Sequence, residues 1–287
     1  MRLRRFTSND DKFAWTFYAG RFMKFIFLGD VVGEPGRDTV RAAIPILRER
    51  YKPDFFVVNG ENAAGGNGIT PRLAVDLMRA GADVITLGDH AWDQREIVPY
   101  FSTEPRLLRP LNFPPGTPGY GSVVVSGNGL KLGVINMLGR TFMGPQVDNP
   151  FLLIEAEIQK LKQEATCILI DFHAEATSEK IAFGRAVDGL ATLVVGTHTH
   201  VQTGDDQIYP GGTAYLTDAG FCGPHESVIG RDIPSVIQKY RTLLPNKFYI
   251  AREGLQADGV FVEADPATGR AIRVERIQQK VTLENES

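Results

Sequence analysis

Cysteine is scarce in this chain, which has only Cys167 and Cys222 among its 287 residues. The two form no Cys-X-X-Cys pair, so neither a disulfide framework nor a thiolate zinc site is indicated. We expect Cys167 in a strand and Cys222 in a loop, both as inert packing residues. Such sparse cysteine suits a reducing cytoplasm.

Long apolar runs are also missing. No segment approaches the roughly 18 apolar residues of a membrane span. Residues 9–12 (Asn-Asp-Asp-Lys) fall where a signal peptide needs an unbroken apolar stretch. The sequence therefore predicts a cytoplasmic protein with no membrane partner.

An excess of one charge sign is absent too, because the formal net charge is -3 and 23% of residues are charged. This balance gives no broad electrostatic reason to expect nucleic acid as a partner. The glycine-rich residues 29–36 have no Gly-Lys-Ser/Thr and miss the G-X-G-X-X-G spacing, and no G-X-S-X-G occurs. These absences exclude a P-loop, a dinucleotide fingerprint and a serine nucleophile elbow.

From Met23 onward, short apolar runs alternate with helical stretches, which predicts one α/β domain with helices covering its sheets. The domain is expected over residues 23–277, after an N-terminal extension (1–22) that is disordered or a start-site artefact. The tail, 278–287, is polar and expected to fray. The predicted strands are 25–28, 54–58, 84–87, 130–136, 167–170, 193–195, 259–263 and 271–274, with a more antiparallel second half. The predicted helices are 38–50, 71–80, 150–164, 178–188 and 232–243.

Polar side chains follow the ends of five predicted strands. They are Asp30, Glu61, Asn62, Asp89, His90, Asp171, His173, His198 and His200. Ligands of open α/β sheets bind outside the carboxyl ends of the strands, so these groups predict a shared metal site. His198 and His200, two apart on extended backbone, would project to the same side. When each group is considered alone, simpler interpretations are open. The two histidines could be a hydrogen-bonded surface pair, Asp30 could be a helix cap, and Glu61-Asn62 could be a polar turn.

The predicted ligands offer nitrogen and oxygen but no thiolate. Iron, manganese, zinc, cobalt or nickel would suit them better than calcium or copper(I). The candidates outnumber the ligands of one tetrahedral ion, whereas two ions about 3.5–4 Å apart would use them. Such pairs stabilise in-line displacement at phosphorus, so phosphate-ester hydrolysis is the leading predicted reaction.

Several residues near these candidate ligands could have more than one role. Asp171 and Glu175 suit partners that orient an imidazole better than metal ligands. His225 fits a rim or subunit-contact residue as well as a site residue. Asp218-Ala219-Gly220 could support the site or form a turn, and we favour the turn.

The strand-end motifs together resemble the calcineurin-like metallophosphoesterases, specifically their YmdB-like bacterial branch, from about residue 23 to about residue 276. The matching segments are 27–33 (Phe-Leu-Gly-Asp-Val-Val-Gly), 58–66 (Val-Asn-Gly-Glu-Asn-Ala-Ala-Gly-Gly), 87–92 (Leu-Gly-Asp-His-Ala-Trp), 171–177 (Asp-Phe-His-Ala-Glu-Ala-Thr) and 196–201 (Gly-Thr-His-Thr-His-Val). The wider superfamily usually opens with Asp-X-His, whereas here Val31-Val32 follows Asp30, as in this branch.

The resemblance implies a four-layer α/β/β/α sandwich of two mixed sheets and a dinuclear centre, often of iron or manganese. It implies that Asp30, Glu61 and His200 hold one ion. The other would be held by Glu61, Asp89, His173 and His198, with Glu61 bridging and Asn62 assisting. His90 would protonate the leaving oxygen while a metal-bridging hydroxide attacks phosphorus.

Asp89 departs from the family motif, which reads Gly-Asn-His. The extra negative charge should tighten cation binding and weaken the Lewis acidity of the ion, or alter the choice of metal. Because Asp and Asn are nearly isosteric, the geometry could survive.

The predicted function is therefore that of a dinuclear, metal-dependent phosphodiesterase, and the resemblance favours 2′,3′-cyclic nucleotides. A phosphomonoesterase is the nearest alternative. In either case Arg109 or Arg140 could bind the phosphate of the substrate, although a surface arginine is more often merely solvated. A third alternative is a non-catalytic regulator that binds a nucleotide or a protein. The family also makes a homo-oligomer plausible.

Overall fold

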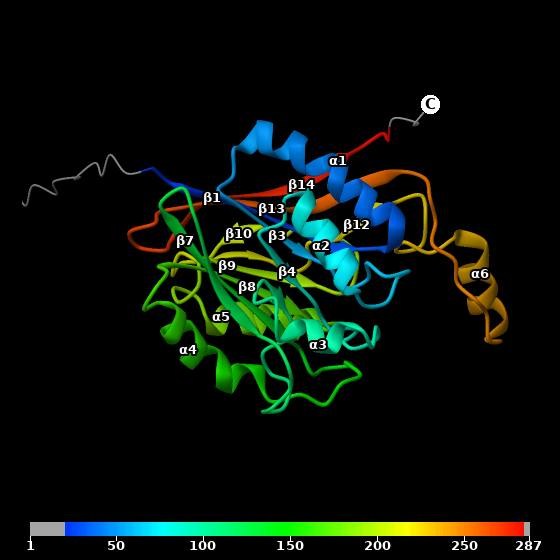
Figure 1. Ribbon diagram of the computed structural model, residues 1–287, viewed down its shortest axis with the longest axis horizontal. Helices are drawn as coiled ribbons and strands as arrows, with labels where there is room; N and C mark the ends of the chain where they lie inside the picture. Colours follow the sequence, from blue (N-terminus) through cyan, green and yellow to red (C-terminus); the bar gives the residue numbers. More distant parts are fainter. Residues whose placement is uncertain (1–20, 284–287) are drawn as a thin grey trace, which may run out of the picture.

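The computed structural model describes residues 21–283, in which two β-sheets pack face to face between outer layers of helices (Figure 1). This α/β/β/α arrangement confirms the predicted fold. The predicted N-terminal extension lies outside the described residues except for Arg21 and Phe22, and so do residues 284–287 of the tail.

The first sheet has eight strands in the order β2-β12-β13-β1-β3-β4-β5, with β14 paired to β13. Its β1, β3, β4 and β5 are parallel, while β13 runs antiparallel to β1, β12 and β14. The strand bounds are β1 (Met23–Leu28), β2 (Asp30–Val31), β3 (Phe55–Asn59), β4 (Val84–Thr86), β5 (Leu107–Leu108), β12 (Phe221–Pro224), β13 (Leu255–Ala264) and β14 (Ala271–Lys280).

The second sheet has six strands in the order β10-β11-β9-β8-β7-β6. Its four central strands are parallel, and only the edge strands β10 and β6 run antiparallel. The expectation of a more antiparallel second half therefore holds for β12–β14 but not for β7–β9. The bounds are β6 (Ser122–Gly127), β7 (Leu130–Leu138), β8 (Cys167–His173), β9 (Leu193–Thr197), β10 (Gln207–Ile208) and β11 (Ala214–Leu216).

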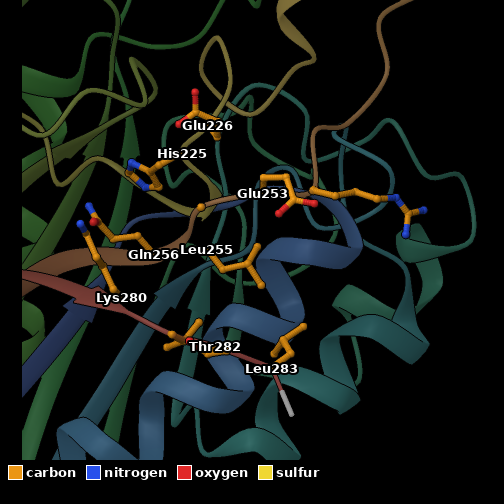
Figure 2. Close-up of a pocket in the computed structure, with 11 residues that line it drawn as sticks. His225, Glu226, Glu253, Leu255, Gln256, Lys280, Thr282 and Leu283 are labelled. Carbon is orange, nitrogen blue, oxygen red and sulfur yellow. The ribbon is translucent and has the colours of Figure 1, made fainter. Parts of the chain in front are cut away.

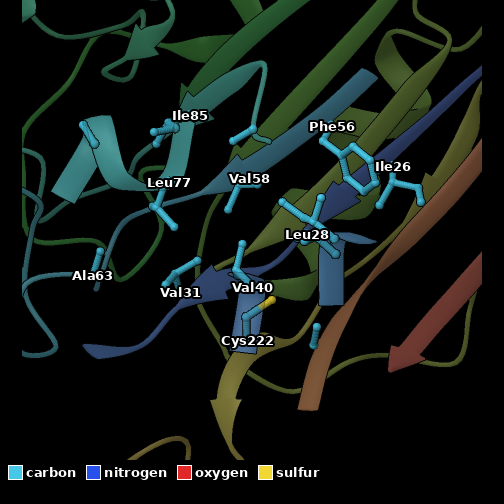
Figure 3. Packing of buried hydrophobic residues seen from close by; sticks show 14 of the residues in the cluster. Ile26, Leu28, Val31, Val40, Phe56, Val58, Ala63, Leu77, Ile85 and Cys222 are labelled. Atoms are coloured by element: carbon cyan, nitrogen blue, oxygen red, sulfur yellow. The ribbon is translucent and has the colours of Figure 1, made fainter. Parts of the chain in front are cut away.

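Alternation along β1 shows how each sheet buries both faces. Phe25 and Phe27 belong to the core between the sheets, whereas Ile26 and Leu28 belong to the core under α1 and α2 (Figure 3). Successive strand side chains point to opposite faces, so an unbroken apolar run is what a doubly covered strand requires. A third core lies between the second sheet, α4 and α5. The helices are α1 (Gly33–Tyr51), α2 (Pro71–Ala80), α3 (Ile97–Phe101), α4 (Pro150–Leu161), α5 (Thr177–Ala186) and α6 (Ile233–Thr242).

Polar caps fix the starts of three helices. Thr70, Asn149 and Asp232 each accept a hydrogen bond from a backbone N–H in the first turn, and a proline follows within two residues. This combination satisfies free N–H groups and presets the backbone, which is why α2, α4 and α6 begin close to their predicted residues.

Some boundaries differ from the prediction. The first helix begins at Gly33 rather than near residue 38, because Pro35 is tolerated in a first helical turn. The final strand continues to Lys280, pairing Gln278 with Asp258, so the expected fraying from Gln278 is wrong. Cys222 lies in β12 rather than in a loop.

Across residues 21–283, no helix combines the length and apolar character needed to cross a bilayer.

Candidate metal centre

The carboxyl ends of strands from both sheets meet at one edge, where the predicted ligands gather. Asp30 begins the short β2, Glu61 and Asp89 follow β3 and β4, His173 ends β8, and the loop after β9 carries His198 and His200. Most of these groups line a pocket of about 170 Å³. The pocket is lined by Val32, Glu61, Asn62, Gly66, His90, His173, His198, His200, Ile229 and Arg231.

Asp89, His173 and His198 form the first group of converging side chains whose lone pairs could bind a metal ion, and we call it the first donor group. The Asp89 Oδ1 lies 3.1 Å from His173 Nε2 and 3.5 Å from His198 Nδ1, and the two ring nitrogens are 3.1 Å apart. A Cβ on Gly88 would lie 2.2 Å from His173 Cδ2, so glycine is required there for the two segments to approach.

The proton position on His173 follows from a buried chain of hydrogen bonds. Burial raises the pKa of Asp171 to about 7, while hydrogen bonds from Thr86 and Thr197 favour its carboxylate form. In that form Thr197 Oγ1 donates to Asp171 (2.7 Å) and accepts from His173 Nδ1 (2.9 Å). The lone pair of His173 is thereby left on Nε2, facing the pocket. Asp171 thus orients the imidazole, as predicted, but through Thr197.

Glu175 acts on the neighbouring imidazole. Its Oε2 lies 3.1 Å from His198 Nε2, and because a carboxylate only accepts, that nitrogen carries the proton. In the neutral ring the Nδ1 lone pair then points at His173 Nε2 and Asp89. Three acceptor atoms facing one another within 3.5 Å need a shared proton or a cation.

Asp30, Asn62 and His200 form the second group of donors. His200 Nδ1 donates to the Ile229 carbonyl (3.1 Å), which leaves Nε2 facing Asn62 Oδ1 at 3.0 Å and Asp30 Oδ1 at 3.8 Å. The Asn62 amide is oriented by its Nδ2, which donates to Gly66 O. Asp30 Oδ1 is buried and has no hydrogen-bond partner among the described residues. A buried carboxylate oxygen without a donor, beside two lone pairs, fits a cation site.

Glu61 lies by the first donor group, with its Oε1 3.9 Å from His173 Nε2. Its carboxylate accepts hydrogen bonds from the backbone N–H groups of Gly88 and His90. Burial, and then the nearby carboxylate of Asp89, raises the pKa of Glu61 well above its usual value. Burial would also raise the pKa of Asp89, but the His173 and His198 imidazoles outweigh it and hold that pKa well below its usual range. Cations would relieve this crowding of a buried and a partly buried carboxylate.

The histidine loop does not continue the strand, contrary to the extended backbone predicted for it. The strand β9 ends at Thr197, and His198 and His200 adopt left-handed φ values of 99° and 61°. Both rings still line the pocket. Non-glycine residues in this region are strained, so surrounding contacts must hold them.

A buried ion pair supplies part of that support. Asp218 Oδ2 accepts from Lys180 Nζ (2.7 Å) and from both the backbone N–H and the hydroxyl of Thr199. Lys180 Nζ also donates to the Thr197 carbonyl at 2.8 Å. Asp218 therefore anchors the loop between the two histidines. Its Oδ1 also accepts from the Gly220 N–H at 2.9 Å, so residues 218–220 form a turn as well as supporting the site.

His90 occupies the rim of the pocket and is about one-third exposed. Its Nδ1 lies 2.8 Å from Asp93 Oδ2, so Nδ1 carries a proton and Nε2 is the nitrogen left for a ligand or substrate. One atom each of Glu61, Asp89 and His90 lie within 4.8 Å of one another. Distance alone therefore admits His90 as a ligand as well as a proton donor.

Arg231 is a pocket residue that the sequence analysis missed. It is half-buried, and its guanidinium donates to Gly66 O and Asn67 Oδ1. The two arginines suggested instead lie elsewhere. Arg109 is buried and donates to backbone carbonyls, including Pro110 O at 2.8 Å, and Arg140 is exposed outside the pocket lining. No signal near residue 231 distinguishes it from other surface arginines.

His225 lines a different cavity, of about 700 Å³, together with Glu226, Gln256 and Lys280 (Figure 2). It stacks on Phe221, whose other neighbour is the His200 ring at 5.5 Å between centroids. His225 is thus behind the site rather than in it. Cys167 and Cys222 are free and buried, and burial raises both thiol pKa values, to about 11 for Cys167.

Comparison with known proteins decides the family, since a model of the YmdB-like proteins matches residues 26–277. The chain belongs to the YmdB-like family. It is 48% identical over 255 residues to a 2′,3′-cyclic-nucleotide 2′-phosphodiesterase of Bacillus subtilis, covering 89% of this chain and 96% of that protein.

Solved structures agree with this membership. A phosphatase of Mycoplasma pneumoniae has a TM-score of 0.85 and 38% identity, covering 91% of this YmdB-like chain and 94% of its own. A hypothetical protein of Thermus thermophilus has a TM-score of 0.83 and 37% identity, and the match covers 90% of this chain and 99% of that protein's chain. The NAD nucleotidase of Haemophilus influenzae, with a TM-score of 0.56 and 13% identity over 91% of this chain and 56% of that one, shares the fold alone.

Proposed function

We propose that this YmdB-like protein is a metal-dependent phosphodiesterase that hydrolyses 2′,3′-cyclic nucleotides to nucleoside monophosphates. The observation that carries the proposal is the meeting of two groups of facing donor atoms, around Asp89 and around Asp30, in one pocket. The B. subtilis relative with 48% identity supports the same reaction class.

In this proposal iron or manganese occupies the site, with zinc, cobalt or nickel as alternatives. The proposed ligands are Asp30, Glu61, Asn62, Asp89, His173, His198 and His200. Two bound ions would activate water and neutralise charge on the phosphate oxygens. The protein contributes fixed donors, because Thr197 and Glu175 hold the protons of His173 and His198 away from the pocket.

His90 is the proposed general acid. Asp93 holds the Nδ1 proton, which leaves Nε2 to carry a second proton to the leaving oxygen of the phosphodiester. Arg231 lies at the same pocket with a positive charge for a phosphate oxygen. The chain thus offers a donor for the leaving group and a cation for the phosphate.

A diester suits this pocket better than a monoester. A monoester dianion carries about two negative charges and a diester only one. Arg231 is the single Arg or Lys in the pocket lining formed by the described residues. A phosphomonoesterase would call for more fixed cations, so it remains the second candidate.

The decisive test is turnover of 2′,3′-cyclic AMP by protein purified without chelator and supplied with manganese or iron(II), with His173→Ala as the control. We expect hydrolysis that the variant loses, together with bound metal. If protein carrying two metals per chain bound 2′,3′-cyclic AMP without hydrolysing it, the protein would be the non-catalytic, nucleotide-binding regulator instead of the proposed enzyme.

We further propose that the domain spans residues 23–277 and acts in the cytoplasm. Two free, buried cysteines support a reducing compartment. Cell fractionation that placed the protein outside the cytoplasm would contradict this. Homo-oligomerisation stays a prediction, which sedimentation analysis can check.

A further inference from the structure

An apolar groove opens beside the metal pocket, along the exposed side of α6. It has a volume of about 420 Å³. Its lining residues are Val228, Ile229, Arg231, Val236, Lys239, Tyr240, Leu243 and Phe248. Ile229 and Arg231 line both the groove and the metal pocket, so the two spaces adjoin.

The sizes of the two spaces indicate how a substrate divides between them. Small-molecule sites usually measure about 300–1,000 Å³, and the metal pocket, at about 170 Å³, is smaller. It has room for a phosphate group but not for a whole nucleotide. The groove, at about 420 Å³, falls within the usual range.

The chemistry of the groove fits an uncharged aromatic group attached to a phosphate. Tyr240 is 80% exposed and Phe248 is 40% exposed, so their rings are available for stacking. Arg231 is placed at the boundary with the metal pocket because it directly precedes Asp232, the N-cap of α6, and bonds to Gly66 and Asn67. The order from pocket to groove is therefore cation, then apolar and aromatic surface.

We propose that this groove binds the nucleobase of the substrate while its phosphate occupies the metal pocket, with Arg231 between the two. The inference rests on the proposed phosphodiesterase function and specifies its substrate class. Stacking on Tyr240 or Phe248 accepts any base, because every base has a π-face. The groove therefore favours nucleotides over other phosphodiesters but discriminates weakly among bases.

The test compares two substrates on the full-length, metal-loaded protein: 2′,3′-cyclic AMP, and methyl riboside 2′,3′-cyclic phosphate, which has no base. Tyr240→Ala and Phe248→Ala are expected to raise KM for 2′,3′-cyclic AMP about tenfold, the usual effect of losing one stacking contact. The kcat for cyclic AMP and both constants for the base-free substrate should stay unchanged. Ile46→Ala, which removes an exposed apolar side chain from α1, is the matched control.

A KM for cyclic AMP that does not change, or one that rises equally for the base-free substrate, overturns the groove assignment. A change of oligomeric state in Tyr240→Ala without a change in KM would assign the surface to a protein contact instead. If the wild type hydrolyses neither substrate, the proposed function fails. Calorimetric binding of adenosine 3′-monophosphate, weakened about tenfold by Tyr240→Ala, then tests the groove separately.

Discussion

Asp89 Oδ1 lies 3.1 Å from His173 Nε2, at the position where the resemblance of the sequence implies an asparagine. The acceptor oxygen is kept in either residue, but Asp89 adds a negative charge to the first donor group. We expect Asp89→Asn to weaken Mn²⁺ binding by at least about tenfold, because an ion loses a charged partner at close range. The activity per bound metal should rise, since an ion that has lost an anionic ligand is a stronger Lewis acid.

Metal content by elemental analysis and kcat across a Mn²⁺ titration check this expectation. Asp89→Glu, which keeps the charge on a longer side chain, separates charge from geometry. An Asp89→Asn protein with unchanged metal content and unchanged rate would contradict it.

Thr197 connects Asp171 to His173 and fixes which ring nitrogen carries the proton. Thr197→Val keeps the volume but removes this connection. Loss of such a supporting contact typically lowers metal affinity about 10–100-fold. We expect that loss together with a decrease of about 1–3 kcal/mol in the free energy of unfolding, because Asp171 loses a buried donor.

Metal-binding isotherms and urea unfolding measure the two effects. Thr197→Ser retains the hydroxyl and should behave nearly as the wild type in metal affinity. Equal losses in the serine and valine variants would show that packing of the methyl group, rather than the hydrogen-bond chain, governs the site.

Asp258 makes stability depend on pH. Burial raises its pKa from 3.8 to about 7, against a hydrogen bond from Gln256. Between about pH 4 and pH 7 the folded protein therefore keeps a proton that the unfolded chain releases, so the free energy of unfolding falls as the pH rises. Asp258→Asn is neutral at every pH and should be about 4 kcal/mol more stable than the wild type at pH 8.

The measurement is urea unfolding of the metal-free proteins from pH 4 to pH 8. The advantage of the asparagine variant should vanish near pH 4, where the wild-type carboxyl is also protonated. Because His225 Nε2 lies 3.6 Å from Asp258, His225→Gln serves as the companion variant. A stability difference that stays constant across the pH range would contradict the assignment.

Local sequence predicts the strand ends and the residues that follow them, because an apolar run and the polar cluster after it are contiguous in the chain. Asp30, Asp89 and His173 are brought to one edge for that reason. By contrast, β12 was missed because Gly223 and Pro224 are atypical of strands, and it exists through pairing with β2 and β13.

Contacts between distant segments were the least predictable part of the site. Arg231 reaches Asn67 across 164 positions of sequence, and Lys180 meets Asp218 across 38. Nothing in the neighbourhood of either residue encodes its partner, because these contacts depend on how the sheets stack. The left-handed φ values at His198 and His200 are likewise supported in part by a distant residue, Asp218.

Asp93 Oδ2 lies 2.8 Å from His90 Nδ1 at the rim of the pocket. If Asp93 positions the His90 imidazole, its effect on catalysis must pass through that ring. His90→Ala should lower kcat for 2′,3′-cyclic AMP about 10²–10⁴-fold, the usual contribution of a general acid. Asp93→Asn should lower kcat by a smaller factor with KM unchanged.

In the double variant, the loss should equal that of His90→Ala alone, because residues that act as a unit are not additive. A diester with a p-nitrophenolate leaving group needs little protonation, so both variants should recover much of their rate on it. Additive losses in the double variant, or no recovery on the activated diester, would mean that His90 holds metal rather than delivering a proton. Metal content of the His90→Ala protein distinguishes these roles directly, since a proton donor can be removed without loss of bound ions.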